Sequence, residues 1–208
     1  MAQSLKPDIR EKILAAGKVE FLNHGYESAS LRHIASMADM TVGNLYRYFD
    51  NKEAINEAIV GNTLNKIDEM VRRISNEGVK LYSSSFDLKF NVHDLKEMLD
   101  ELADELVDIF VRAKDEFRIL LLNSELNNKL TDWFGTLISG FIESKYPLKG
   151  FDQEKDLMAK AFAVSILDGI KIIFNEQDLA ITKLKLLIRI YFHAYIEMLD
   201  GDLRKMLE

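Results

Sequence analysis

The stretch SLRHIASMADMTVGNLYRYFDNKEAI, residues 30–55, decides the fold. It holds two short pieces with helical apolar spacing, LRHIASMA and VGNLYRYF, and each follows a hydroxyl residue that can cap a helix, Ser30 and Thr41. Helices this short cannot bury their apolar stripes alone, so they must pack on each other and on a preceding helix. We therefore expect a three-helix head whose inward-facing residues are Ile34, Ala35, Ala38, Leu45 and Phe49.

The residues before this stretch predict the first helix of the head. Asp8 and Glu11 have the spacing of a capping box, and Gly25, directly after His24, is a C-terminal stop signal. The helix should therefore run from about Asp8 to His24. Its expected core stripe is Ile9, Ile13, Leu14, Gly17 and Phe21.

The rest of the chain also reads as helical. Asn51 can cap a long connecting helix that ends near Gly78, and periodicity is lost from there to Val92. The chain has only two prolines, Pro7 and Pro147. We expect an all-α protein with a helix-turn-helix head in 1–51 and a helical body in 52–208. The further helices predicted in the body cover residues 94–114, 115–123, 125–145, 152–175 and 180–200.

Composition narrows the classes of protein. The 208 residues are 48% hydrophobic, which suits a globular protein with a sizeable core. Zero cysteines exclude disulfides, thiolate metal sites and a cysteine nucleophile. The start of the chain lacks a signal-peptide apolar region, and no later run approaches the ~18 apolar residues of a membrane span. We expect a soluble, cytoplasmic protein with no membrane partner.

The net charge of -7 argues at first against a nucleic-acid partner, because phosphate contacts need Lys and Arg. The charge is unevenly distributed, however. Residues 1–52 hold 7 Lys/Arg against 6 Asp/Glu, a balance of +1, and residues 53–208 hold 20 against 28, a balance of -8. The acidic excess therefore belongs to the body.

No catalytic pattern stands out. The four histidines, His24, His33, His93 and His193, lack a paired ligand spacing such as H-E-x-x-H. The carboxylates of DELADELVD alternate with an apolar stripe, as on a solvated helix face. Glycine-rich phosphate loops and the G-x-S-x-G elbow are absent. We expect no enzyme, no cofactor and no metal site.

Residues 30–55, extended back through ILAAGKVEFLNHGY from residue 13, resemble the DNA-binding signature of the tetracycline-repressor (TetR) family. Two departures stand in the signature: Asp39 replaces a turn glycine and Tyr48 replaces a frequent histidine. Aspartate tolerates the left-handed conformation better than most residues. Lys18 and Glu20 stand where the family often has leucine, which suggests a rotated stripe or solvent-facing ends.

The resemblance implies a transcription regulator that reads DNA through the helix opening at Thr41. Its small first turn, Val42, Gly43 and Asn44, suits a major groove roughly 12 Å wide. Phosphate anchors or groove contacts are expected from the hydroxyl, phenolic and cationic side chains nearby: Ser30, Arg32, Tyr46, Arg47, Tyr48 and Lys52.

Dimerisation is expected through the last two helices. Residues 157–174 are apolar around most of their circumference, and Asp168-Gly169 there would permit a close helix crossing. A C2 dimer would present two reading helices about 34 to 36 Å apart to a palindromic operator. The apolar stripe of the last helix comprises Leu184, Leu187, Ile188, Tyr191, Phe192, Tyr195, Ile196 and Leu199.

The family resemblance further implies a small, apolar effector that enters the body and releases the DNA, so that the regulator is a repressor. Aromatic and methionine side chains line apolar cavities. The candidate pocket residues are Met98, Phe110, Phe117, Trp133, Leu137 and Phe141. The alternative is an all-helical ligand-binding or scaffold protein without DNA activity, which the acidic net charge would favour.

Overall fold

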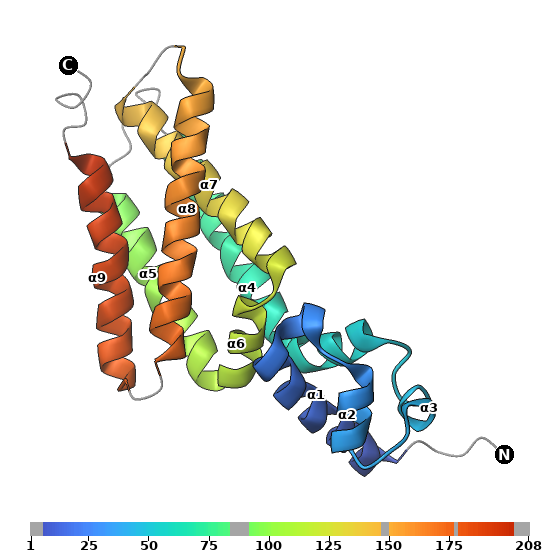
Figure 1. Cartoon of the computed structure of the whole chain (residues 1–208). Coiled ribbons are helices and arrows are strands. Elements are labelled where there is room, and N and C mark those ends of the chain that lie inside the picture. Colours follow the sequence, from blue (N-terminus) through green and yellow to red (C-terminus); the bar gives the residue numbers. More distant parts are fainter. Residues whose placement is uncertain (1–5, 84–91, 147–149, 177–178, 202–208) are drawn as a thin grey trace. The chain divides into compact units, whose positions relative to one another are not determined.

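The structure is a computed structural model that describes residues 6–83, 92–146, 150–176 and 179–201 (Figure 1). Within these ranges all regular secondary structure is helical, so the all-α fold class is confirmed. The helices are α1 (Pro7–Ser28), α2 (Leu31–Met37), α3 (Val42–Leu45), α4 (Lys52–Ser83), α5 (Val92–Arg112), α6 (Lys114–Leu121), α7 (Ser124–Lys145), α8 (Asp152–Asn175) and α9 (Ile181–Asp200). No helix in the described ranges is both long and apolar enough to span a bilayer.

The chain divides into two compact units. The first consists of Met1–Lys66 together with Ala113–Ser124, and the second of Ile67–Arg112 together with Glu125–Glu208. The first unit therefore adds the start of α4 and all of α6 to the three helices of the head. The division into a DNA-binding part, residues 1–51, and a ligand-binding and dimerisation part, residues 52–208, remains a prediction.

The head packs as the sequence predicts. α2 lies against both α1 and α3, and each short helix thereby covers the apolar side of its neighbour. The five residues predicted to face inward, Ile34, Ala35, Ala38, Leu45 and Phe49, are all buried. The three-helix core of the head is confirmed.

The two ends of α1 differ from the prediction in part. The helix begins at Pro7, and its N-cap residue Lys6 makes no side-chain cap hydrogen bond, so the predicted capping box of Asp8 and Glu11 is wrong. Proline fits this first position because its fixed φ is already helical and its missing N–H would have no helical partner. Gly25 breaks the helix as expected, with a φ of 70°, and a further turn then continues to Ser28.

The predicted lengths of α3 and α4 also need correction. α3 has four residues, and a turn over 46–48 follows in place of a helix up to Phe49. At the start of α4, Asn51 Oδ1 accepts a hydrogen bond from the Ala54 N–H at 2.7 Å, which confirms the predicted cap. α4 continues to Ser83, so the loop predicted from Gly78 is wrong for 78–83, and its remainder over 84–91 lies outside the described residues.

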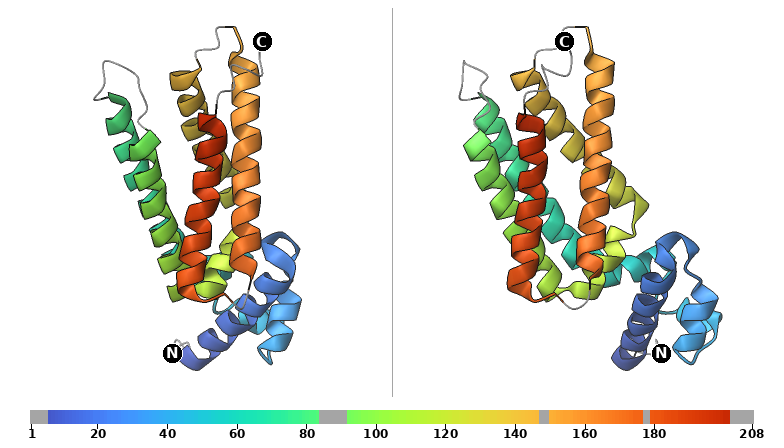
Figure 2. Two further views of the ribbon diagram at one scale, coloured as in Figure 1. Left: turned by 90° about the vertical axis from the view of Figure 1, so that its left-hand side faces the viewer. Right: turned by 60° about the vertical axis from the view of Figure 1, so that its left-hand side comes forward.

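In the second unit, α9 lies beside α5 and α8 (Figures 1 and 2, red beside green and orange). A Cβ atom added at Gly169 of α8 would lie 1.9 Å from the hydroxyl oxygen of Tyr191 on α9. That hydroxyl donates to the Ser165 carbonyl at 2.8 Å, which holds the tyrosine ring in place. A larger residue at position 169 would force the Tyr191 side chain to shift, so Gly169 makes room for this ring, and the close helix crossing stays a prediction.

Candidate functional site

The turn between α2 and α3 is centred on Asp39. Its φ is 55°, in the left-handed region that few residues other than glycine adopt readily. The Asp39 N–H donates to the Ser36 carbonyl and the Met40 N–H to the Ala35 carbonyl, so the end of α2 is closed by backbone hydrogen bonds. The expectation that aspartate serves here in place of a turn glycine is confirmed.

The first turn of α3 is fixed at its start and open on its outer side. Thr41 Oγ1 accepts a hydrogen bond from the Asn44 N–H at 3.2 Å, which confirms the predicted cap. Thr41 and Gly43 are exposed, Val42 and Asn44 are half-buried, and Leu45 is fully buried. A Cβ atom added at Gly43 would have no neighbour within 4 Å. The turn therefore presents backbone and small side chains to its surroundings.

The other predicted contact residues of the head surround this turn in sequence and differ in exposure. Arg32, Tyr46 and Arg47 are exposed, whereas Tyr48 is half-buried. Ser30 is the N-cap residue of α2, but its hydroxyl makes no cap hydrogen bond, so the predicted capping role of that side chain is wrong. Contacts of these residues with DNA remain a prediction.

Lys52 has a structural environment that the sequence did not indicate. Its ammonium donates to the carbonyl oxygens of Tyr26 at 2.6 Å, Glu27 at 3.0 Å and Ala29 at 3.2 Å. The same nitrogen lies 4.7 Å from the centroid of the Tyr26 ring. Its three donors thus satisfy carbonyls that the end of α1 leaves without helical partners. The role of Lys52 as a phosphate anchor stays a prediction, and its contacts with the three carbonyls favour a structural role.

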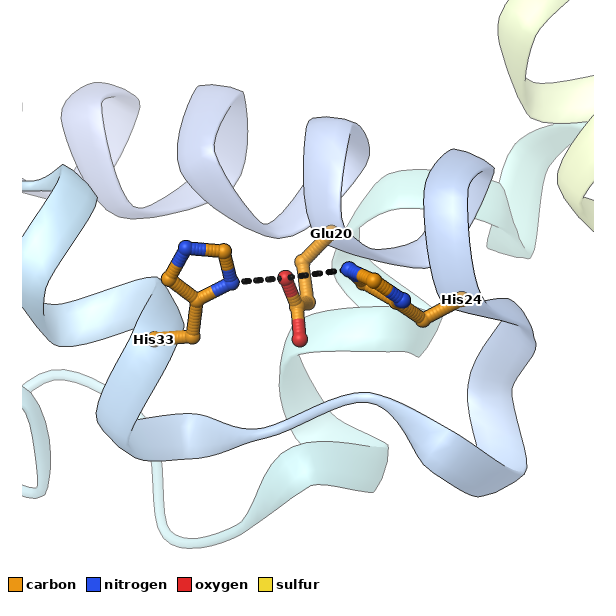
Figure 3. A group of neighbouring side chains, drawn as sticks. All are labelled: Glu20, His24 and His33. Carbon is orange, nitrogen blue, oxygen red and sulfur yellow. Dashed lines mark hydrogen bonds and ion pairs between the residues drawn. The ribbon is translucent and has the colours of Figure 1, made fainter.

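Glu20 is buried in the head, only 2% exposed, so of the two alternatives, a rotated stripe or solvent-facing ends, the second is wrong for this residue. Its Oε1 accepts a hydrogen bond from the Ser30 N–H at 2.9 Å, and its Oε2 lies 2.5 Å from His33 Nδ1 and 3.8 Å from His24 Nε2 (Figure 3). Burial acts to raise the pKa of Glu20, but the Ser30 and His33 contacts outweigh it and hold the pKa below its ordinary value.

Sequence reasoning missed this cluster and the partner of Lys18. Glu20 and His24 lie one helical turn apart, a spacing that could have been noticed, but the position of His33 depends on how α2 packs. Lys18 is also explained by the fold, since its ammonium lies 2.6 Å from Glu116 Oε1 on α6.

The second unit contains an apolar cavity of about 50 Å³. Three predicted pocket residues line it, namely Met98, Leu137 and Phe141. Such a volume has room for only a few water-sized groups, so a drug-sized molecule would have to widen it. The full lining consists of Leu95, Met98, Leu99, Phe134, Leu137, Ile138, Phe141, Ile166, Phe192, Tyr195, Ile196 and Leu199.

The other three predicted pocket residues do not line this cavity. The Phe110 ring lies 4.8 Å from that of Phe174, centroid to centroid. Trp133 donates its indole N–H to Ser75 Oγ at 2.7 Å. Phe117 belongs to α6, in the first unit, and is buried. Ligand binding by these three residues remains a prediction.

The apolar stripe predicted for the last helix faces mainly the interior of its own protomer. Leu184, Ile188 and Phe192 are at most 3% exposed, so this part of the stripe packs within the protomer, and dimerisation through the last two helices stays a prediction. An apolar set of α8 and α9 that includes Leu187 of the predicted stripe is exposed. It consists of Leu157, Val164 and Ile172 on α8 and Ile181, Leu186, Leu187, Ile190 and Met198 on α9.

We predict that Lys52→Met destabilises the protein by about 1–3 kcal/mol, because it leaves carbonyl oxygens of the α1 end without donors. Urea unfolding monitored by circular dichroism measures this effect. Lys12→Met, at an exposed position of α1, is the matched control and should change stability by less than about 0.5 kcal/mol. Equal stability of the two variants would contradict the structural role of Lys52.

Sequence comparison finds a family match that covers most of the head and the start of α4. The model described as bacterial regulatory proteins, tetR family, matches residues 13–59. The HTH-type transcriptional repressor KstR of Mycobacterium tuberculosis is 36% identical over 64 residues, which are 31% of this chain and 29% of that protein. KstR of Mycolicibacterium smegmatis is 35% identical over 69 residues, 33% of this chain and 34% of that protein. The match thus spans about a third of the length of these curated relatives.

Solved structures resemble the chain over most of its length. A TetR-like transcriptional regulator from Rhodococcus sp. RHA1 has a TM-score of 0.56 and 14% identity, covering 96% of this chain and 100% of that one. A TetR-family transcriptional regulator from Syntrophomonas wolfei has a TM-score of 0.50 and 17% identity, covering 91% and 95%. At such identities these likenesses establish the fold alone. Residues 13–59 therefore match the tetR family of bacterial regulatory proteins by sequence, and the chain as a whole has the fold of TetR-family regulators.

Proposed function

We propose that this chain is a transcriptional repressor that binds a palindromic operator as a homodimer and is released by a small apolar effector. The observation that carries the proposal is the outward first turn of α3, where Thr41 and Gly43 are exposed while Leu45 anchors the helix inside. Such a protein would act in the cytoplasm on double-stranded DNA.

The chemistry of that turn suits the major groove. Gly43 lets the backbone approach base edges because no atom occupies the space beyond it. Val42 can contact a thymine methyl group, and the Asn44 amide can hydrogen-bond to adenine. Base contacts of this kind specify sequence, whereas phosphate contacts position the protein.

Exposed cations supply the sequence-independent part of binding. Arg32 and Arg47 lie on the surface of the head, and the phenolic groups of Tyr46 and Tyr48 can donate to phosphate oxygens. Each phosphate neutralised by a cation adds to the salt dependence of affinity. Repression rather than activation is proposed because both KstR proteins that match part of the chain are named repressors.

The dimer is proposed to form through the exposed apolar residues of α8 and α9. Leu157 and Ile172 on α8 are 70% and 74% exposed, and Leu186 and Ile190 on α9 are 58% and 55% exposed. These exposed apolar side chains lie on two helices that contact each other, and contiguous exposed apolar surface marks an interaction site. A C2 axis brings the same patch of each subunit together, so each of these residues would be buried in both subunits.

The effector is proposed to bind at the cavity lined by α5, α7, α8 and α9. Its lining is almost entirely aliphatic and aromatic, with the hydroxyl-bearing Tyr195 as the polar exception, so the ligand should be largely apolar. Because the cavity is small, a ligand must favour a wider state of these helices. A ligand shifts the DNA-binding equilibrium only through such a difference in affinity between two states.

Gly43→Phe should abolish specific DNA binding without unfolding the head, because the new ring occupies the space that the DNA needs. A duplex selected from random DNA serves as the probe, and fluorescence anisotropy at several salt concentrations measures affinity. We expect at least a tenfold loss, about 1.4 kcal/mol or more, with an unchanged melting temperature. Ala58→Phe, at an exposed position of α4, is the control and should keep wild-type affinity.

Two results would count against the DNA-binding proposal. Wild-type affinity in Gly43→Phe would show that α3 does not face the DNA. Failure of the wild-type chain to retain any duplex from the random pool would favour the alternative of a ligand-binding or scaffold protein without DNA activity.

Ile190→Asp should convert the dimer to a monomer, since the substitution places two carboxylates in one apolar interface. Size-exclusion chromatography with light scattering gives the mass directly. Val111→Asp is the matched control, because Val111 is a similarly exposed residue of α5 in the same unit, at 45%. A dimeric Ile190→Asp, or a monomeric wild type, would rule out this interface.

Leu137→Trp should fill part of the cavity and weaken binding of the apolar probe 1-anilinonaphthalene-8-sulfonate by about tenfold, a loss of about 1.4 kcal/mol. Probe fluorescence, titrated with each variant, measures the affinity. Thr136→Trp changes the neighbouring exposed position of α7 and should bind the probe as the wild type does. Indistinguishable binding curves for the two variants would place the apolar site elsewhere.

A further inference from the structure

Three potential metal ligands converge in the head, at the side chains of Glu20, His24 and His33. Figure 3 shows the Glu20 carboxylate between the two imidazole rings, with Glu20 and His24 on α1 and His33 on α2. One ligand atom from each residue lies within 4.8 Å of the other two. No other such trio of His, Cys, Asp or Glu side chains comes together in the part of the chain that the structure describes.

We propose that Glu20, His24 and His33 form a binding site for a divalent transition-metal ion of the Zn²⁺ class. The site goes beyond DNA binding and effector release, and it does not depend on either. It also revises the expectation, drawn from the spacing of the histidines alone, that the chain has no metal site.

The donor set suits such an ion. Two imidazole nitrogens and one carboxylate oxygen are ligands that Zn²⁺ binds in proteins, at about 2.0–2.2 Å from the metal. Imidazole donors also suit Cu²⁺ and Ni²⁺, whereas Mg²⁺ and Ca²⁺ prefer oxygen ligands alone. The site is therefore expected to select transition metals over Mg²⁺ and Ca²⁺.

The distances require small adjustments of the two histidine rings. Ligand atoms around a tetrahedral ion with such bonds lie about 3.4 Å apart. His24 Nε2 already lies 3.8 Å from Glu20 Oε2, whereas His33 Nδ1 at 2.5 Å would have to withdraw by about 1 Å. The two histidine side chains are 50% and 54% exposed, so both rings have space to turn.

The carboxylate is held in place for this role. The Ser30 N–H donates to Oε1, which leaves Oε2 directed toward the two rings. Fixing a ligand through a hydrogen bond to its other atom is the usual way in which proteins orient metal ligands. The exposed outer side leaves a fourth coordination position to water and gives the ion a path of entry.

Binding at this site would tie α2 to α1. Glu20 and His24 are one turn apart on the same helix, and only His33 comes from the second helix. An ion held by all three joins the two helices in the folded state, and the unfolded chain lacks the arrangement. Metal binding must therefore raise the stability of the head.

The test uses the full-length protein, freed of metal with a chelator and titrated with ZnCl₂ by calorimetry. We expect one ion per chain and a melting temperature that rises with Zn²⁺ concentration. Titration with CoCl₂ should give the visible absorption bands of four-coordinate Co²⁺. His24→Gln and His33→Gln each remove one ligand and should weaken Zn²⁺ binding at least about tenfold.

His93→Gln is the matched control. His93 lies 3.2 Å from Glu97 and forms a histidine–glutamate pair with i, i+4 spacing, but it is not part of a group of three ligands. This variant should bind Zn²⁺ like the wild type. Equal Zn²⁺ affinity of the wild type and His33→Gln, or a loss in His93→Gln as large as in His33→Gln, would overturn the proposal. None of these readouts involves DNA, so their failure leaves the proposed function untouched.

Discussion

The burial of Leu45 and Phe49 is the constraint on which the rest of the head depends. α3 has only four residues, too few to be stable without tertiary packing. With Leu45 fully buried and Phe49 5% exposed, the opposite side of the turn, at Thr41 and Gly43, has to lie at the surface. The exposed position of the first turn of α3 therefore follows from the packing of the core.

The body uses the two sides of α9 differently. Leu184, Ile188 and Phe192 on one side complete the core of the protomer, whereas Leu186 and Ile190 on the other side are exposed. A helix that is apolar on both sides needs a partner for each. Within the protomer these partners include α5 and α8, and the proposed second subunit covers the exposed side.

The sequence predicted periodic features well and spatial neighbours poorly. Buried positions such as Ile34 and Leu45 follow from helical spacing, and the caps by Thr41 and Asn51 follow from local chemistry. The His33 partner of Glu20 and the carbonyl partners of Lys52 could not be found in this way, because they lie outside the helix of the residue they contact and their positions depend on tertiary packing. For the same reason only some of the predicted pocket residues line the cavity. Leu137 lines it, whereas Trp133, one turn earlier on α7, donates a hydrogen bond to Ser75 instead.

We propose that the first turn of α3 is the surface that meets DNA. Hydrogen–deuterium exchange measured by mass spectrometry, with and without a duplex selected from random DNA, tests it most directly. We expect the duplex to slow amide exchange in the peptide spanning 41–49. If the duplex slowed exchange only in other parts of the chain and left exchange in 41–49 unchanged, α3 would not be the DNA-contacting surface.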